Sequence, residues 1–126
     1  MANKTIQTTT IDGKEATVFW ITTTDASAGR CKVGYSIGNF NPDIVLVPGD
    51  VNSSLACALV ASRNGIKVGH IESGLRSFDR AMPEEINRII IDDLSDFFFV
   101  TEKSGIEHLN KEGKEKNKII ELQHGI

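Results

Sequence analysis

The sequence predicts an α/β fold, with a Rossmann-like parallel sheet flanked by helices. From Asp43 onward, short apolar runs with little polar alternation take turns with segments of helical periodicity. Strands of that kind are typical of a parallel sheet whose two faces are covered, and their alternation with helices indicates βαβ units. The expected strands are 43–47, 66–71, 97–100 and 118–122, and the expected helices are 53–65, 83–96 and 104–113.

Residues 1–42 form a separate, divergent N-terminal segment, so we divide the chain into 1–42 and 43–126. The run "KTIQTTTIDGKEATVFWITTT" alternates apolar and polar positions around Asp12-Gly13. That pattern is typical of a β-hairpin, and a mixed edge strand fits it equally well. Residues 26–40 have a helical pattern weakened by glycines and ended by Asn41-Pro42.

Each of the two longer predicted helices carries an apolar stripe that we expect to face the sheet. In helix 53–65 the stripe is Leu55, Ala56, Leu59 and Val60. Asn52 or Ser53 is its expected N-cap, and Gly65 its C-terminal stop. In helix 83–96 the expected buried residues are Ile86, Ile89, Ile90 and Leu94.

Composition argues against several classes of partner. The 126 residues carry a formal net charge of −3 and are 40% hydrophobic, with a pI near 5.6, which gives no electrostatic case for nucleic acid or an anionic membrane. No apolar run approaches a membrane span, and "MANKTIQTTT" lacks the apolar core of a secretory signal. We therefore expect a cytoplasmic protein. Cys31 and Cys57 lack metal-site spacing, so we expect two buried thiols and no metal site.

Acidic residues gather at one edge of the predicted sheet. Polar groups follow three successive strands, namely Asp50, Glu72 and the pair Thr101-Glu102. Ligands of parallel sheets bind beyond the carboxyl ends of the strands, where these residues should meet. Glu84 and Glu85 open the helix that begins at Pro83, and they can face the same crevice.

Each acidic residue also has an ordinary structural interpretation. Asp50 is a candidate cap of the following helix, and Glu84 and Glu85 suit a helix N-terminus, where Glu84 also pairs favourably with Arg88. Of these two, Glu85 should point about 100° away from Glu84 and serve the helix dipole as an exposed charge.

Residues near the expected end of strand 66–71 carry further expectations. Glu72 should be partly buried and paired with Arg76 or Arg88. The residues favour a hydrogen-bonded core role for His70, a tight turn or close ligand approach at Gly74, and a surface position for His108.

The segment 42–113 resembles the non-hydrolysing UDP-N-acetylglucosamine 2-epimerases, in the second half of their N-terminal domain. "GHIESGLRS" and "PEEINR" occur in the order and separation of the family motifs H-x-E-[AS]-G-L-R-S and M-P-E-E-x-N-R. The resemblance implies part of a glycosyltransferase-B-like fold and no metal or other cofactor. It also implies interconversion of UDP-GlcNAc and UDP-ManNAc by elimination and re-addition of UDP.

The resemblance also implies roles for individual residues. It places the catalytic acids at Asp50, Glu72 and Glu84. It places substrate-binding groups at Arg76, Arg88, Gly74 and His70. Carboxylates whose pKa is shifted by burial and by one another suit removal of the weakly acidic C2 proton on one face and its return on the other.

The sequence departs from the family pattern at several points. Pro48 replaces a histidine, Val51 a threonine and Ala81 a proline, and "VTEKS" lacks the usual proline before Thr-Glu. The G-T-R-P-E loop and the C-terminal domain of the family have no counterpart in the sequence. We therefore expect a fragment of an epimerase, inactive alone, that self-associates or joins the remaining epimerase domain. The alternative is a non-catalytic α/β binding module or partner subunit.

Overall fold

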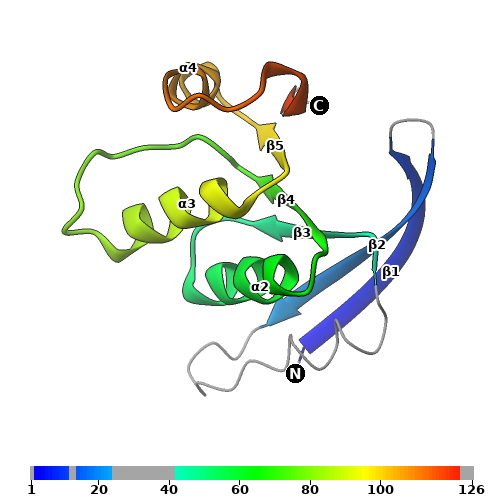
Figure 1. The fold of residues 1–126 in the computed structure, drawn as a ribbon. Coiled ribbons are helices and arrows are strands. Elements are labelled where there is room, and N and C mark those ends of the chain that lie inside the picture. Colours follow the sequence, from blue (N-terminus) through cyan, green and yellow to red (C-terminus); the bar gives the residue numbers. More distant parts are fainter. Residues whose placement is uncertain (1, 12–13, 24–41, 123–126) are drawn as a thin grey trace.

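The computed structural model describes residues 2–11, 14–23 and 42–122. Its strands are β1 (Ala2–Ile11), β2 (Lys14–Thr23), β3 (Ile44–Pro48), β4 (Lys67–Ile71), β5 (Phe97–Val100) and β6 (Ile119–Glu121). Its helices are α2 (Asn52–Arg63), α3 (Pro83–Leu94), α4 (Lys103–Lys111) and the short 3-10 helix η2 (Lys116–Lys118). The alternation of strands and helices expected from residue 43 onward is confirmed (Figure 1).

The six strands form one sheet in chain order, β1-β2-β3-β4-β5-β6. β2 to β6 run parallel, whereas β1 pairs with β2 in antiparallel register from Ala2 with Thr23 to Ile11 with Lys14. Of the two alternatives for the N-terminal segment, the structure therefore has the hairpin, and β1 lies at an edge of the sheet. The expected helix at 26–40 and Cys31 lie outside the described residues.

The helices α2, α3 and α4 cover the same face of the sheet. Because the parallel strands follow chain order, right-handed connections bring each helix back over that face. One apolar core joins β3 and β4 to α2 and α3: Val45, Val47, Cys57, Ala58, Ala61, Ile66, Val68 and Ile91. A second, smaller core joins β5 to α4: Phe98, Val100 and Leu109. Cys57 is buried in the first core, as predicted.

The predicted apolar stripe of α2 is rotated from the one observed. Its buried residues are Ser54, Cys57, Ala58 and Ala61. Of the predicted stripe, Leu55 and Val60 are partly buried and pack against the first core, whereas Leu59 is 41% exposed. Small side chains allow α2 to lie close to the sheet, and the larger apolar residues are pushed to its flanks. The expected N-cap is also wrong, because Val51 occupies that position without a side-chain hydrogen bond. The helix ends at Arg63, two residues before Gly65, as predicted.

The buried side of α3 also differs from the prediction, because it is largely polar. Its buried residues are Glu85, Asn87, Ile91 and Asp92. Ile86 is 42% exposed, while Leu94 packs against the first core as expected. Apolar periodicity alone missed this face because three of its four buried side chains are polar and hydrogen-bonded to loops.

The turn after β4 packs directly against the start of α4. Gly74 has a φ of 81°, a left-handed conformation that glycine adopts without steric cost. A Cβ on Gly74 would overlap the carbonyl oxygen of Gly105 in α4. Gly113 has the same φ of 81°, but a Cβ added there meets nothing within 4 Å.

We expect Gly74→Ala to lower the free energy of unfolding by about 3 kcal/mol or more, because left-handed strain adds to overpacking against α4. Gly113→Ala, with the same backbone strain and free space, should cost only about 1–2 kcal/mol. Urea denaturation of both variants measures the difference. Equal losses would show that contact with Gly105 does not constrain the turn.

Candidate active site

The connection between β4 and α3, residues 72–82, is the most strained segment of the described chain. Glu72 and Phe78 are its two non-glycine residues with positive φ, 68° and 60°. Such conformations cost of order 1–3 kcal/mol each and persist only where surrounding contacts impose them. Two carboxylates of α3 supply those contacts.

The first is Asp92, which is fully buried. Its Oδ1 accepts hydrogen bonds from His70 Nδ1 at 2.6 Å and Ser73 Oγ at 3.0 Å. Its Oδ2 accepts from the backbone N–H of Gly74 at 3.0 Å and from Arg76 at 2.8 Å. One carboxylate therefore ties β4 and the turn after it to α3. Sequence reasoning missed Asp92, although an acidic residue amid the apolar "NRIIIDDL" was a signal of a buried, paired charge.

The second is Glu85, which is only 1% exposed. It accepts the backbone N–H of Ser77 at 3.0 Å and of Phe78 at 2.8 Å. Arg88 lies 3.4 Å from it on the same helix. The expectation that Glu85 is an exposed charge serving the helix dipole is therefore wrong. Its side chain reaches the loop instead, because the two amides have no partner within a helix or strand.

Both carboxylates have a pKa below the ordinary value. Burial by itself raises the pKa of Asp92, but the hydrogen bond and charge of His70, the charge of Arg76 and the Gly74 N–H outweigh it. Burial also acts to raise the pKa of Glu85, and the Ser77 and Phe78 amides with the arginine charges lower it further than burial raises it. Both side chains are therefore held as hydrogen-bond acceptors.

His70 connects this network to the turn after β3. It is fully buried, and its Nε2 lies 2.7 Å from the carbonyl oxygen of Gly49. The N–H of Gly49 donates to the carbonyl oxygen of Ile71 at 3.1 Å. The predicted core role of His70 is thus confirmed, while the substrate contact implied by the family resemblance stays a prediction.

Asp50 is held by α3 and does not cap α2. Its Oδ2 accepts from Arg88 at 2.8 Å, and Asn87 donates to its carbonyl oxygen at 2.9 Å. The Nε of Arg88 is buried without a hydrogen-bond partner among the described residues. Arg88 thus lies beside Asp50, consistent with the predicted gathering of charge at this edge.

Glu72 and Glu84 are both exposed, unlike Glu85 and Asp92. No hydrogen bond or ion pair links either side chain to another described residue. Partial burial of Glu72 with Arg76 or Arg88 was expected and is wrong, since both arginines pair with other carboxylates. Gly49 and Ile71 are hydrogen-bonded to each other at the ends of adjacent strands, and Asp50 and Glu72 are the residues that follow them. Glu84 lies in the first turn of α3, one turn before Arg88.

Arg76 fixes the loop to α4. It donates to Asp92, to the carbonyl oxygen of Leu75 at 2.7 Å and, through two nitrogens, to Glu112 at 3.0 and 3.1 Å. Burial alone would lower the pKa of Arg76, but these carboxylates raise it above its ordinary value. Nearby, His108 Nδ1 lies 2.7 Å from the carbonyl oxygen of Gly74, so His108 is partly buried and not a surface residue as expected.

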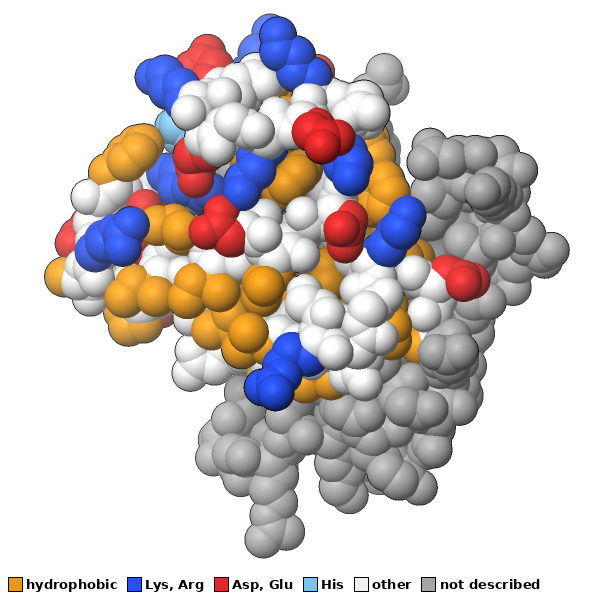
Figure 2. All heavy atoms as spheres, viewed as in Figure 1, with side chains coloured by type: hydrophobic (Ala, Val, Ile, Leu, Met, Phe, Trp, Pro, Cys, Tyr) orange, Lys and Arg blue, Asp and Glu red, His pale blue; other side chains and the backbone are white. Residues whose placement is uncertain are grey.

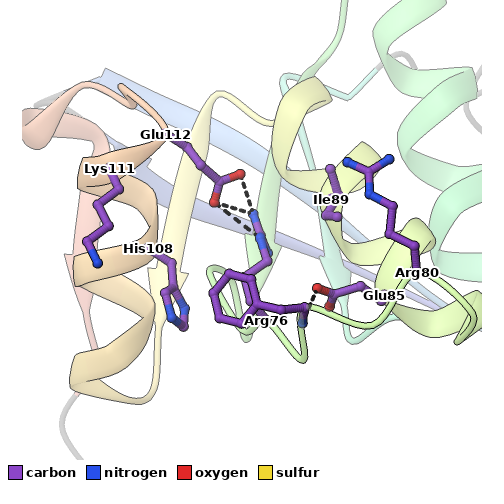
Figure 3. Close-up of a pocket in the computed structure, with 8 residues that line it drawn as sticks. Arg76, Arg80, Glu85, Ile89, His108, Lys111 and Glu112 are labelled. Carbon is purple, nitrogen blue, oxygen red and sulfur yellow. Dashed lines mark hydrogen bonds and ion pairs between the residues drawn. The ribbon is translucent and has the colours of Figure 1, made fainter.

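A separate open pocket of about 370 Å³ lies between this loop, α3 and α4 (Figure 3). The Phe78 ring stands edge-on to His108 there, with centroids 5.2 Å apart. The pocket is lined by Arg76, Phe78, Arg80, Glu85, Ile89, His108, Lys111 and Glu112. It includes none of the three predicted catalytic acids, so we do not place the candidate active site in it.

Two negative findings concern the described residues alone. Within 2–11, 14–23 and 42–122, no group of three or more His, Cys, Asp or Glu side chains is arranged to hold a metal ion. In that same part of the chain, no helix has the length and apolarity needed to cross a membrane.

We expect Glu85→Gln to lower the free energy of unfolding by about 1–3 kcal/mol at pH 7, because it weakens charge-assisted bonds to buried amides. The folded-state pKa is lowered, so this contribution is complete above the unfolded-state pKa and is lost as pH falls through the folded one. The difference between wild type and variant should therefore shrink in acid. Urea denaturation at several pH values measures it.

Glu84→Gln is the matched control, one residue away and exposed. It should change the free energy of unfolding by less than about 1 kcal/mol, as expected for a charge near a helix N-terminus. A loss as large as that of Glu85→Gln would contradict the assignment of Glu85 to the loop.

Comparison with known proteins assigns the fold and the motifs to one family. The sequence profile described as UDP-N-acetylglucosamine 2-epimerase matches residues 24–122. The UDP-N-acetylglucosamine 2-epimerase of Methanococcus maripaludis is 56% identical over 78 residues, which cover 62% of this chain and 21% of that protein. The UDP-2,3-diacetamido-2,3-dideoxy-D-glucuronate 2-epimerase of Pseudomonas aeruginosa is 52% identical over 83 residues, 64% of this chain and 23% of that protein.

Solved structures agree. The UDP-GlcNAc 2-epimerase of Methanocaldococcus jannaschii matches with a TM-score of 0.70 and 46% identity, over 72% of this chain and 25% of that one. The same enzyme has been solved with UDP-GlcNAc and UDP, and that of Neisseria meningitidis with UDP-GlcNAc. The chain spans about a quarter of the length of the relatives it matches. Its sequence and its fold show that the chain belongs to the UDP-N-acetylglucosamine 2-epimerase family.

Proposed function

We propose that this chain is the acid-bearing part of a UDP-N-acetylglucosamine 2-epimerase, with Asp50, Glu72 and Glu84 acting at C2 of the sugar. One observation carries the proposal: Glu72 is held in a strained left-handed conformation with an exposed, unpaired carboxylate at the carboxyl edge of the sheet. Strain and an unpaired charge at a ligand-binding edge are typical of functional sites. No hydrogen bond or ion pair within the described part of the chain uses that carboxylate.

The chemistry needs two carboxylates that exchange protons and a fixed geometry. One group removes the C2 proton as the bond from C1 to the UDP oxygen breaks, which leaves a C1–C2 double bond. A proton then reaches C2 from the opposite face, and UDP adds again at C1. Glu72 and Glu84 suit the proton transfers because their side chains are free. Asp50, beside Arg88 at 2.8 Å, suits orientation of the sugar or stabilisation of charge.

The implied substrate-binding residues Arg88, Arg76 and Gly74 contribute in two different ways. The orphaned Nε of Arg88 supports a direct contact with the substrate. Arg76 and Gly74 use their polar groups within the chain, so we propose that they act by shaping the turn after β4.

The rest of the site is proposed to come from the remaining part of the epimerase. In the related structures bound to UDP-GlcNAc, the matched segment is only about a quarter of the chain. Uridine and diphosphate contacts are then supplied by a second domain that also excludes water from the intermediate. The competing candidate, a non-catalytic module that binds a partner, is favoured by the exposed apolar side chains over α2, α3 and the connecting loop (Figure 2). These are Leu59, Phe78, Met82 and Ile86.

Those apolar side chains also support association, either between copies or with the missing domain. A cytoplasmic location stays a prediction. The Pseudomonas relative named for a diacetamido uronate is nearly as similar as those named for UDP-GlcNAc. UDP-2,3-diacetamido-glucuronate is therefore the competitor to include in binding tests.

We expect the purified chain to show no turnover of UDP-GlcNAc, because a half-open site binds the nucleotide weakly and admits water. The measurement is exchange of the C2 proton with deuterium, followed by NMR. The full-length Methanocaldococcus jannaschii relative serves as the positive control. Exchange by the chain alone at the rate of that enzyme would overturn the proposed need for a second domain.

When the chain replaces the matching segment of that relative, Glu72→Gln and Glu84→Gln should each lower C2 exchange by at least roughly 100-fold. Amides cannot take up or return the proton. Glu107→Gln, an exposed change on α4, should leave the rate intact. Equal rates in all three variants would return Glu72 and Glu84 to the class of ordinary surface charges and favour the binding-module alternative.

A further inference from the structure

The buried carboxylate of Asp92 contacts the turn that carries Glu72, and through His70 it is connected to the turn that carries Asp50. We infer that Asp92 is the positioning residue for both: it fixes the Glu72 turn directly and the Gly49–Asp50 turn through the ring of His70. The relevance to catalysis rests on the proposed function, whereas the coupling of the two turns is a property of the chain alone.

The direct connection runs through the residues that follow Glu72. The N–H groups of Glu72 and Ser73 both donate to the carbonyl oxygen of Phe99, at 3.0 and 3.1 Å, which fixes the start of the turn to β5. Asp92 accepts from the Ser73 hydroxyl and the Gly74 N–H, which fixes its end. Glu72 lies between these anchors, so its left-handed backbone is imposed from both sides.

The second connection runs through His70. Its Nε2 faces the carbonyl oxygen of Gly49, which can only accept, so Nε2 must carry a proton. Its Nδ1 faces the Asp92 carboxylate, another acceptor, and donates as well. Loss of the carboxylate therefore removes the partner that orients the ring, and with it the fixed position of the Gly49 carbonyl immediately before Asp50.

A purely stabilising role explains this arrangement less well. A buried ion pair is often no more stabilising than apolar side chains of similar volume, because the charges lose their hydration. Asp92 accepts four hydrogen bonds, three of them from the turn after β4 and the fourth from a ring that reaches the next turn. We infer that these four hydrogen bonds serve to fix the positions of the two turns at this edge of the sheet.

The test is NMR of the ligand-free 126-residue chain. In the unmodified chain, both ring nitrogens of His70 should carry a proton, and Nε2 should show coupling across a hydrogen bond to the Gly49 carbonyl. A His70 ring without a proton on Nε2 would overturn the indirect connection. This measurement depends on no substitution and therefore on no variant that must fold.

Asp92→Asn should then shift the amide signals of both Asp50 and Glu72 and speed exchange of the Gly74 N–H by at least about tenfold. Asp93→Asn is the control, because Asp93 is the exposed neighbour and its side chain pairs with Lys114, away from both turns. If Asp92→Asn folds and loses thermal stability while the amide signals of both turns stay unchanged, the inference is wrong. Asp92 would then contribute to stability alone.

Failure of this inference and failure of the proposed function give different results. The two turns could respond together while the Methanocaldococcus jannaschii relative that carries this chain shows no C2 exchange. That result would keep Asp92 as a positioning residue and contradict the epimerase proposal. Alternatively, C2 exchange could depend on Glu72 and Glu84 while the two turns respond independently to Asp92→Asn. That result would support the epimerase proposal and contradict the role inferred for Asp92.

Discussion

The structure depends on the hydrogen bonds that buried polar side chains of α3 make to the loops around it. Asp92 and Glu85 hold the strained connection after β4, and Asn87 and Arg88 hold the turn after β3. At about 100° per residue, Glu85, Arg88 and Asp92 fall on one side of the helix, whereas Asn87 lies further round, next to Ile91. Because α3 itself packs on the sheet through Ile91, the loops take their positions from the core. The buried polar side chains of α3 therefore set the positions of the two loops at the candidate active site.

This arrangement separates two kinds of carboxylate that look alike in the sequence. Glu84 and Glu85 are neighbours, yet one is exposed and unpaired while the other is buried with two amide partners. The buried acids have amides and cations that keep their pKa low, so they act as constant acceptors. The exposed acids are free to meet a ligand. Under the proposed function, α3 would therefore both hold the loops through Glu85 and supply Glu84 as a reactive group.

The strands from residue 43 onward were predictable because an apolar run such as "FFFV" fits a strand buried on two faces and little else. Helix positions were predictable within a few residues, since Pro83 and Gly65 mark local limits that depend on the backbone alone. The buried faces of α2 and α3 could not be predicted from the sequence in the same way. Ala58 and Ala61 are buried because small residues permit close packing, which depends on the sheet opposite. Likewise, the partners of Glu85 and Arg76 depend on tertiary contacts, which for Arg76 lie 36 residues away in sequence, and no local pattern reports them.

The contact of Gly74 with Gly105 has a consequence for how this segment can be divided or exchanged. The turn that carries Glu72 leans on α4 through that contact, through the His108 ring and through the Arg76–Glu112 pair. A piece of the protein cut before α4 would keep every proposed catalytic acid but lose the surface against which their loop is shaped. The smallest segment that keeps these contacts together therefore runs from β3 to Glu112, just past the end of α4. Exchange of sequence within this segment would separate the loop from its support, whereas exchange at its two ends would not.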